Sequence, residues 1–335
     1  MITQDSVLVQ LMRLIDRIPS PPPPPRRPRG RPKFYPEKLF LKVLVIMVVR
    51  RLHRVGELSA VLDEPNPEMR MVRELLHEKG RCPSKRTFER RLKALPGALP
   101  EQVGCLGRHL VELLRPWEKT GRALALDSTP LRAKGGVWHK KDKEAGRVPH
   151  SSIDTEADWT KSGWHGWVYG WKLHLAVCVG AMWIPLCAKL TPANTADNEV
   201  APYLIEELPE EARFVLGDTH YDAPNVREAC QSSGKVLVTS KRGPYPHTDP
   251  GVEVRRVFHK LRSVANEKFN EHFKAIFEVH EQVPTRGLIN TARFALGAVF
   301  VYQLALLYRH ERRLDIKGWT LIVDSNPFSE RLDEL

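Results

Sequence analysis

Apolar residues in the first third of the chain recur every three or four positions, which is the spacing of helices that bury one face. This spacing predicts a short amphipathic helix within residues 1–18, ahead of a proline run at 21–25 that favours an extended spacer. It predicts further helices over 37–54, 68–79, 84–95 and 101–114. Ser84 is a suitable N-cap for the helix that follows it. The N-terminal third is therefore expected to be all-helical.

From Arg122 onward the pattern changes to short apolar runs separated by turn residues, which is typical of strands. These runs predict five strands, at 122–127, 170–179, 183–190, 213–218 and 235–239. Helical spacing predicts helices at 198–208, 224–232 and 257–277. The apolar stretch 294–308 is shorter than the roughly 20 residues of a membrane span, so we expect a buried helix. This order of elements predicts an α/β core.

The net charge of the chain limits the kinds of molecule that it is expected to bind. Lys and Arg number 52 against 40 Asp and Glu, which gives a formal net charge of +12. Such a surplus favours nucleic acid, because each neutralised phosphate releases condensed counterions. Membrane headgroups and acidic proteins remain alternatives on charge alone.

The cysteines indicate a reducing compartment. There are five of them, widely spaced and without a CxxC pair, which argues against a zinc knuckle or a disulfide framework. Asp5 lies early and no long apolar segment follows it, so no signal peptide is expected. We expect a cytoplasmic, nucleoid-associated protein.

Two carboxylates directly follow apolar runs that should be buried. Asp127 comes after Ala123–Leu126, and Asp218 after Phe214–Gly217. An unpaired charge beside a buried strand is costly, and a bound cation removes that cost. Pairs of divalent ions on carboxylates activate the attacking oxygen and stabilise the leaving oxygen in phosphodiester chemistry. Capping of a strand end or a turn is the alternative interpretation.

Four short segments carry a resemblance to a known family. They are ALDST from Ala125, YGWKLH from Tyr169, LGDTHYD from Leu216 and NEKFNEHFK from Asn266. Together they resemble the DDE transposases of bacterial insertion sequences, over roughly residues 35 to 310. The resemblance implies a ribonuclease H-like mixed five-stranded sheet flanked by helices, preceded by an all-helical domain. It also implies that Asp127, Asp218 and Glu267 bind two Mg²⁺ or Mn²⁺ ions.

The last of these segments departs from the family pattern at one position. The family often shows Arg, three residues, Glu, six residues and Lys. Glu267 and Lys274 keep the second gap, whereas four residues separate Arg262 from Glu267. Lys274 lies two helical turns beyond Glu267, where it is expected to meet a DNA phosphate. A solvent-facing glutamate and a simple surface lysine are the alternatives.

Several cations are candidates for DNA contacts. Arg29 and Arg31 form an Arg-Gly-Arg element suited to a narrow minor groove, with a basic linker as the alternative. Arg86 and Arg90 lie on the 84–95 helix, which is a candidate recognition helix.

Two further candidates lie near the expected strands. Lys161 belongs to a loop, 132–169, rich in Lys and Trp, which suits either an unpaired DNA end or a solvated loop folded back on the sheet. Lys172 shares a strand face with His174, which is either a site residue or a core histidine.

The expected organisation has four parts: a flexible Pro/Arg-rich arm (1–36), a helical DNA-binding domain (37–118), a catalytic domain (119–312) and a tail (313–335). The function expected is metal-dependent cleavage of double-stranded DNA at insertion-sequence ends and strand transfer into target DNA. Bringing two ends together predicts a homodimer or larger assembly on DNA. A DNA-binding relative without activity and a ribonuclease H-like nuclease are the alternatives.

Overall fold

The computed structural model describes residues 6–23, 33–114, 121–163, 166–180, 182–239 and 252–313, and within them six strands form one mixed sheet. Their bounds are β1 Ala123–Arg132, β2 Asp158–Ser162, β3 Gly166–Cys178, β4 Pro185–Pro192, β5 Phe214–Gly217 and β6 Val236–Thr239. All five predicted strands are confirmed. β2 was not predicted, because its sequence, DWTKS, is polar and none of its residues is fully buried.

The connectivity of the sheet is that of a ribonuclease H-like fold. β1 pairs antiparallel with β3, which pairs antiparallel with β4. On its other edge β1 pairs in parallel with β5, and β5 with β6. The order is thus β4-β3-β1-β5-β6, with β2 added as a hairpin partner along the first part of β3. The predicted fold class is confirmed, with one extra strand.

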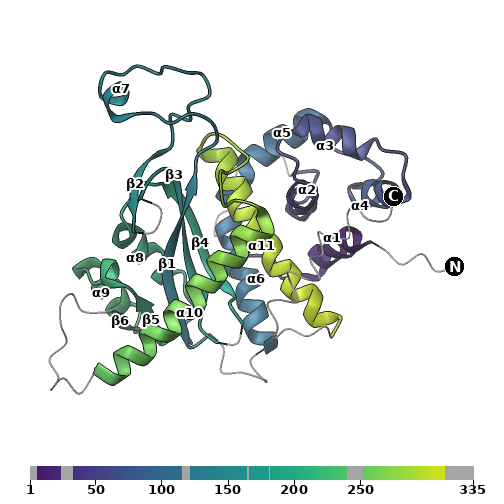
Figure 1. The fold of residues 1–335 in the computed structure, drawn as a ribbon. Coiled ribbons are helices and arrows are strands. Elements are labelled where there is room, and N and C mark those ends of the chain that lie inside the picture. The colour runs from purple at the N-terminus through teal and green to yellow at the C-terminus, as the bar shows by residue number, and fades with distance from the viewer. Residues whose placement is uncertain are drawn as a thin grey trace.

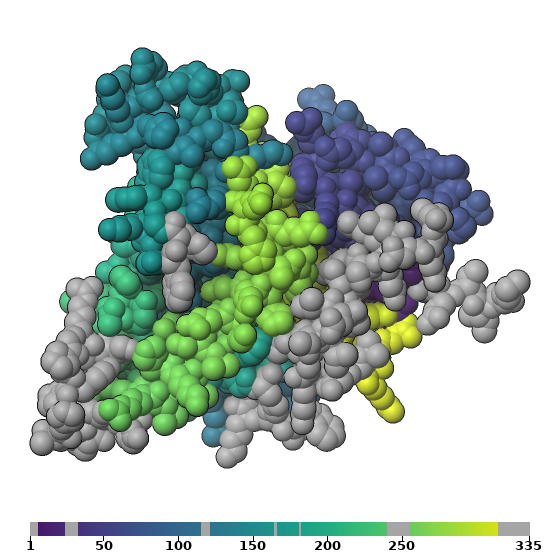
Figure 2. Space-filling view, viewed as in Figure 1, coloured from purple at the N-terminus to yellow at the C-terminus, as the bar shows by residue number. Residues whose placement is uncertain are grey.

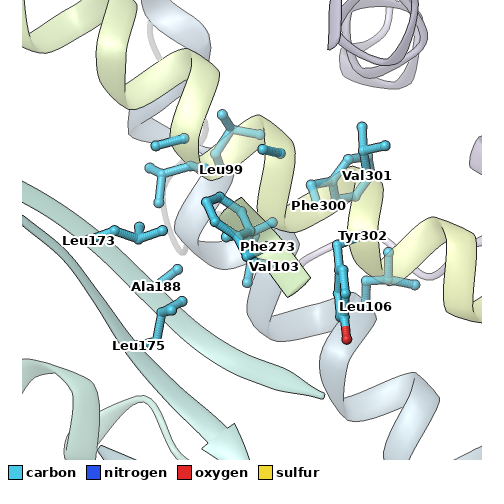
Figure 3. Close-up of a cluster of buried hydrophobic side chains, with 14 of the residues drawn as sticks. Leu99, Val103, Leu106, Leu173, Leu175, Ala188, Phe273, Phe300, Val301 and Tyr302 are labelled. Carbon is cyan, nitrogen blue, oxygen red and sulfur yellow. The ribbon is translucent and has the colours of Figure 1, made fainter. Parts of the chain in front are cut away.

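Helices cover both faces of the sheet (Figure 1). α8 (Asp197–Glu206) and α9 (Pro224–Ser232) lie on one side, and α6 (Leu99–Leu114), α10 (Val252–Phe277) and α11 (Leu288–Glu311) lie on the other. On the second side Phe273 of α10 packs near Leu173 and Leu175 of β3 (Figure 3). Side chains from α6 and α11 complete this cluster, so the sheet and the C-terminal helices share one core.

Five helices precede α6. They are α1 Val7–Arg17, α2 Glu37–Val49, α3 Val55–Leu62, α4 Pro67–Leu75 and α5 Lys85–Ala94. α2 is apolar around its whole circumference and is almost entirely buried. α1 buries its apolar face in the same hydrophobic core. Residues 7–17 are therefore packed, although they fall within the segment expected to be a flexible arm.

α11 is the central helix of the C-terminal part. It is longer than predicted, and by length and composition alone it would pass for a membrane span. However, 89% of its most apolar window is buried inside the fold. It is therefore the core helix that its apolar sequence predicted. Its first backbone N–H groups, of Gly287 and Leu288, donate to the carboxylates of Asp154 and Glu156 at 2.8 Å.

Two differences from the expected pattern affect the site. β1 does not end at Asp127 but continues to Arg132, because Ser128–Arg132 pair with Gly170–His174 of the long strand β3. Between β1 and β2 the chain forms an excursion with one short helix, α7 (Lys140–Glu144). This excursion projects from the end of the sheet (Figure 2).

Candidate active site

Asp127 and Asp218 come together because their strands are parallel neighbours. Ala125 of β1 lies opposite Leu216 of β5, and each aspartate follows two residues later. Asp127 lies opposite Leu175 in the antiparallel pair of β1 and β3, so it points to the sheet face that carries α10. The two predicted metal ligands therefore share one edge of the central strands.

The surroundings of Asp127 hold its proton unusually firmly. Burial raises the pKa of this carboxyl to about 7, the nearby charge of Arg262 lowers it, and the charge of Asp218 raises it again. Asp197 adds a weaker effect that also raises the pKa. At neutral pH the aspartate is thus poised between its two protonation states, and a bound cation would favour the ionised one.

Asp218 ends β5 and caps a short 3-10 turn, Thr219–Tyr221. Its Oδ1 accepts the backbone N–H of His220 at 2.8 Å, and its Oδ2 lies 3.1 Å from His220 Nδ1. Gly217 is required before it, because a Cβ there would lie 2.6 Å from the Cβ of Tyr221. The turn thus places the carboxylate at the end of the strand and leaves the imidazole of His220 exposed.

Tyr221 is a buried member of this site that the sequence reasoning did not single out. Burial raises its pKa well above the usual value, and the charges of Asp197, Asp127 and Asp218 add to the effect. Its hydroxyl has no hydrogen-bond partner among the residues that the structure describes. The signal was present in the sequence LGDTHYD, where this tyrosine follows the second aspartate by three positions.

Helix α10 contributes two asparagines to the same region. Asn266 donates from Nδ2 to the backbone oxygen of Leu126 at 3.2 Å, and Asn270 donates from Nδ2 to Asp127 Oδ2 at 3.4 Å. The Oδ1 atoms of both asparagines are buried and lack a hydrogen-bond partner in the described part of the chain. In the sequence both positions are recognisable only as part of the segment NEKFNEHFK.

The cations predicted on α10 also face Asp127. Arg262 lowers the pKa of the aspartate, despite its irregular spacing from Glu267. The pKa of Lys274 is lowered by burial and by Arg132, while Asp127 opposes that shift. Both cations therefore lie within electrostatic range of the first aspartate.

Glu267 lies on the same helix but is exposed to solvent. At 3.6 residues per turn it is about 60° around the helix axis from Asn270. Within the described residues no group of three or more His, Cys, Asp or Glu side chains is arranged to hold a metal ion. The structure brings Asp127 and Asp218 together without Glu267, whose role as third ligand stays a prediction.

Lys172 lies on the other face of the sheet. Its Nζ contacts Asp197 Oδ1 at 3.2 Å and the backbone oxygen of Thr195 at 3.1 Å. His174, two positions on, is fully buried and lies 2.9 Å from Thr191 Oγ1 through its Nε2. Burial lowers the pKa of His174 to about 4. Both residues thus face α8 rather than Asp127.

The remaining DNA-contact candidates lie away from the aspartates. Arg86 and Arg90 are exposed on α5, whereas the neighbouring Arg91 pairs with Glu37. Lys161 is exposed on β2, opposite Trp167 of β3, whose side chain is also exposed.

In the same loop, Trp138 and Trp159 fold back, because their indole N–H groups donate to Arg147 and Trp138 backbone oxygens at 2.8 Å. Arg29 and Arg31 lie outside the described residues.

The donor set suits a divalent cation. Two neighbouring carboxylates, one of them with a raised pKa, form a site that is relieved of repulsion when a cation binds. The two partnerless amide oxygens of Asn266 and Asn270 are hard oxygen donors of the kind that Mg²⁺ and Mn²⁺ prefer. The fit rests on these oxygen ligands, and the exposed imidazole of His220 contacts Asp218 beside them.

Comparison with known proteins agrees with this geometry. The family model of the transposase DDE domain matches residues 118–263, a range that includes Asp127 and Asp218 and ends before Glu267. No curated protein matches.

Among solved structures, a piggyBac transposase synaptic complex with hairpin DNA aligns with a TM-score of 0.37 and 11% identity, covering 98% of this chain and 78% of that one. A Mos1 transposase paired-end complex aligns with a TM-score of 0.21 and 13% identity, covering 84% and 81%. These superpositions are loose, so the fold assignment rests on the strand connectivity described above. Residues 118–263 therefore match the transposase DDE domain, over somewhat less than half of the chain.

Proposed function

We propose that this protein is a transposase that cuts double-stranded DNA at the ends of its own insertion sequence and transfers the freed ends into target DNA. The observation that supports this proposal most directly is the juxtaposition of Asp127 and Asp218 at the β1–β5 pair, with the pKa of Asp127 raised to about 7. Carboxylates are placed in this way where a cation is to be bound.

In this proposal Asp127 and Asp218 hold two Mg²⁺ or Mn²⁺ ions, and Glu267 completes the ligand set. When bound, such ions supply Lewis-acid activation of water or a 3′-hydroxyl and stabilise the leaving oxygen. Asn270 fixes the orientation of the Asp127 carboxylate through its Nδ2. Lys274 lies within electrostatic range of Asp127 and offsets the charge of the scissile phosphate.

A second candidate function is DNA binding without cleavage. The exposed position of Glu267 favours it, because the described residues bring two carboxylates together rather than three. Both candidates require binding of duplex DNA, ultimately by a dimer or larger assembly that pairs two ends. They differ only in whether the bound DNA is cut.

The test is a nicking assay on duplexes that carry the terminal repeats flanking the gene, with and without Mg²⁺. We expect wild type to nick them, and Asp127→Ala and Asp218→Ala to lose at least roughly 1000-fold in rate, the scale of losing a group that acts on the transition state. Asp222→Ala is the matched control, because Asp222 follows closely in the chain but pairs with Arg227.

The assay separates the two candidates. Mobility shifts without metal report binding, so DNA that is retarded but never nicked by wild type would identify the non-cleaving relative. Nicking by Asp127→Ala at the wild-type rate would exclude the proposed active site.

A further inference from the structure

A second polar region lies where the N-terminal helices meet the start of α11. A cavity of about 490 Å³ opens there between α3, α5 and the first turn of α11. Its lining includes Arg54, Lys93, Glu156 and Arg293. No residue of the proposed active site lines it.

Arg293 is the unusual member of this lining. Its side chain is only 8% exposed, and its Nη2 donates to the backbone oxygen of His53 at 3.3 Å. Among the described residues it forms no ion pair with a carboxylate, whereas the comparable Arg50 and Arg91 pair with Glu68 and Glu37. Burial lowers the pKa of Arg293, yet a guanidinium stays charged in proteins. Its buried charge therefore lacks a counter-ion.

The other charges around the cavity do not neutralise it. Lys93 and Arg54 are exposed cations at its rim. Against them stand two glutamates: Glu89 is exposed, and Glu156 already accepts the backbone N–H of Leu288. Burial lowers the pKa of His53, so this histidine is neutral at pH 7 and adds no charge. Glu57 and Lys134 also act on His53 beside this lining, so four cations stand against three carboxylates and the cavity stays positive.

The cavity also continues a row of cations on α5. Arg86, Arg90 and Lys93 are spaced by four and three residues, so they share one face of the helix. All three are exposed, and the last of them lines the cavity. A polyanion lying along this face would reach the cavity at the end of the row.

We propose that Arg293, with Lys93 and Arg54 at the rim, binds a phosphate of the DNA backbone as a duplex passes along α5. The inference rests on the proposed function in that the polyanion is DNA. It assigns the site a backbone contact, which fixes the position of the duplex without reading its sequence. A buried arginine is suited to this task, since its planar fork binds phosphate through two hydrogen bonds.

The unpaired charge of Arg293 is expected to lower the melting temperature of the protein, and this effect can be tested. A buried cation without a partner destabilises the fold, and replacing it by an apolar side chain of similar length relieves that cost. Arg293→Met is therefore expected to melt at a higher temperature than wild type while binding DNA more weakly. A merely structural arginine would change in the opposite direction in the melting experiment.

The experiment measures binding of a duplex of about 20 base pairs in EDTA over a range of KCl concentrations. We expect Arg293→Met to bind about fivefold more weakly at low salt, with the slope of log K against log salt shallower by about 0.9, the value for one phosphate contact. Arg293→Lys keeps the charge and should keep the slope. Arg309→Met is the control, since Arg309 is 5% exposed on the same helix and does not line the cavity.

Three results would overturn the inference. The first is a salt slope for Arg293→Met equal to that of Arg309→Met, and the second is a melting temperature of Arg293→Met below that of wild type. The third is a rise in the melting temperature of wild type with inorganic phosphate while Arg293→Met binds DNA as wild type does. The last would indicate a free-anion site. Because metal is absent, these results are independent of cleavage. If wild type failed to bind the duplex at all, the proposed function itself would fail.

Discussion

Two clusters of polar side chains lie on opposite faces of the same sheet, a few residues apart along β1 and β3. On the α8 face, Lys172 pairs with Asp197, and His174 is hydrogen-bonded to Thr191. On the α10 face, Asp127 lies beside Asp218, and the Oδ1 atoms of Asn266 and Asn270 lack partners among the described residues.

The difference separates a structural cluster from a functional one. In the first cluster each charge has its partner, so burial of the group is balanced within the protein. In the second, the carboxylates of Asp127 and Asp218 repel each other beside the opposing charge of Arg262, and two acceptor oxygens lack partners in the described part of the chain, so a bound cation would stabilise the arrangement. Burial is similar in both, and the first cluster also holds one buried atom without a hydrogen-bond partner among the described residues, His174 Nδ1, so it is the balance of charge that identifies the site.

The largest effect is expected from removing one partner of the Lys172–Asp197 ion pair on the α8 face. Asp197→Ala leaves Lys172 with its charge only 13% exposed and without its carboxylate. We expect the free energy of unfolding to fall by about 3 kcal/mol, as for other buried pairs that lose one partner. Asp218→Asn removes a repulsive charge beside Asp127 but keeps an oxygen that can cap the 219–221 turn, so it is expected to leave stability unchanged or slightly higher. Urea unfolding of both variants at pH 7 without metal measures the contrast.

The control for this prediction is the double variant Asp197→Leu with Lys172→Met, which replaces the pair by apolar side chains. It should recover most of the lost stability, because no buried charge is left alone. Equal destabilisation by Asp197→Ala and Asp218→Asn would show that the two clusters do not differ as described.

A second prediction contrasts the two clusters by their pH dependence. The pKa of Asp127 is raised to about 7, so the folded protein holds a proton that the unfolded chain releases near pH 4. Its contribution to stability is present at low pH and is lost as pH rises from about 4 to 7. The pKa of His174 is lowered to about 4, so its contribution is present above about 6.5 and is lost as pH falls toward 4.

Replacing each residue should therefore tilt the stability profile in opposite directions. Relative to wild type, Asp127→Asn should gain stability as pH rises from about 4 to 7, with a slope of up to about 1.4 kcal/mol per pH unit. Relative to wild type, His174→Gln should gain stability as pH falls from about 6.5 to 4. Urea unfolding at several pH values between 4 and 7.5 measures both slopes, and parallel profiles for the two variants would contradict the assignment.

The sequence predicted five of the six described strands and the strand positions of Asp127 and Asp218, for a physical reason. Apolar runs decide where strands lie, and Asp127 and Asp218 each interrupt or end such a run. The polar strand β2 carries no such signal, because it is held by pairing with β3 rather than by burial of its own side chains. The extension of β1 beyond Asp127 likewise depends on its partner strand.

The rest of the site depended on rotation about a helix, which sequence spacing alone specifies poorly. Glu267, Asn270 and Arg262 all lie on α10, and which of them faces β1 is decided by the packing of Phe269 and Phe273 into the core. The role of Arg293 could not be predicted from the sequence for another reason. It depends on the lack of a carboxylate paired with Arg293 among the described residues, and no sequence pattern indicates such a lack.

The smallest expected effect concerns Asn270, which touches Asp127 from α10 at 3.4 Å. If it orients the carboxylate for a cation, Asn270→Ala should weaken Mn²⁺ binding about tenfold, as is common for residues that support a metal ligand. Titration of the protein with Mn²⁺, followed by electron paramagnetic resonance without DNA, gives this affinity directly. Asn290→Ala is the control, since Asn290 bonds only to the backbone of its own helix start. Unchanged Mn²⁺ affinity in Asn270→Ala, together with a marked loss in Glu267→Gln, would mean that α10 turns on metal binding, bringing the glutamate to the place that the asparagine holds here.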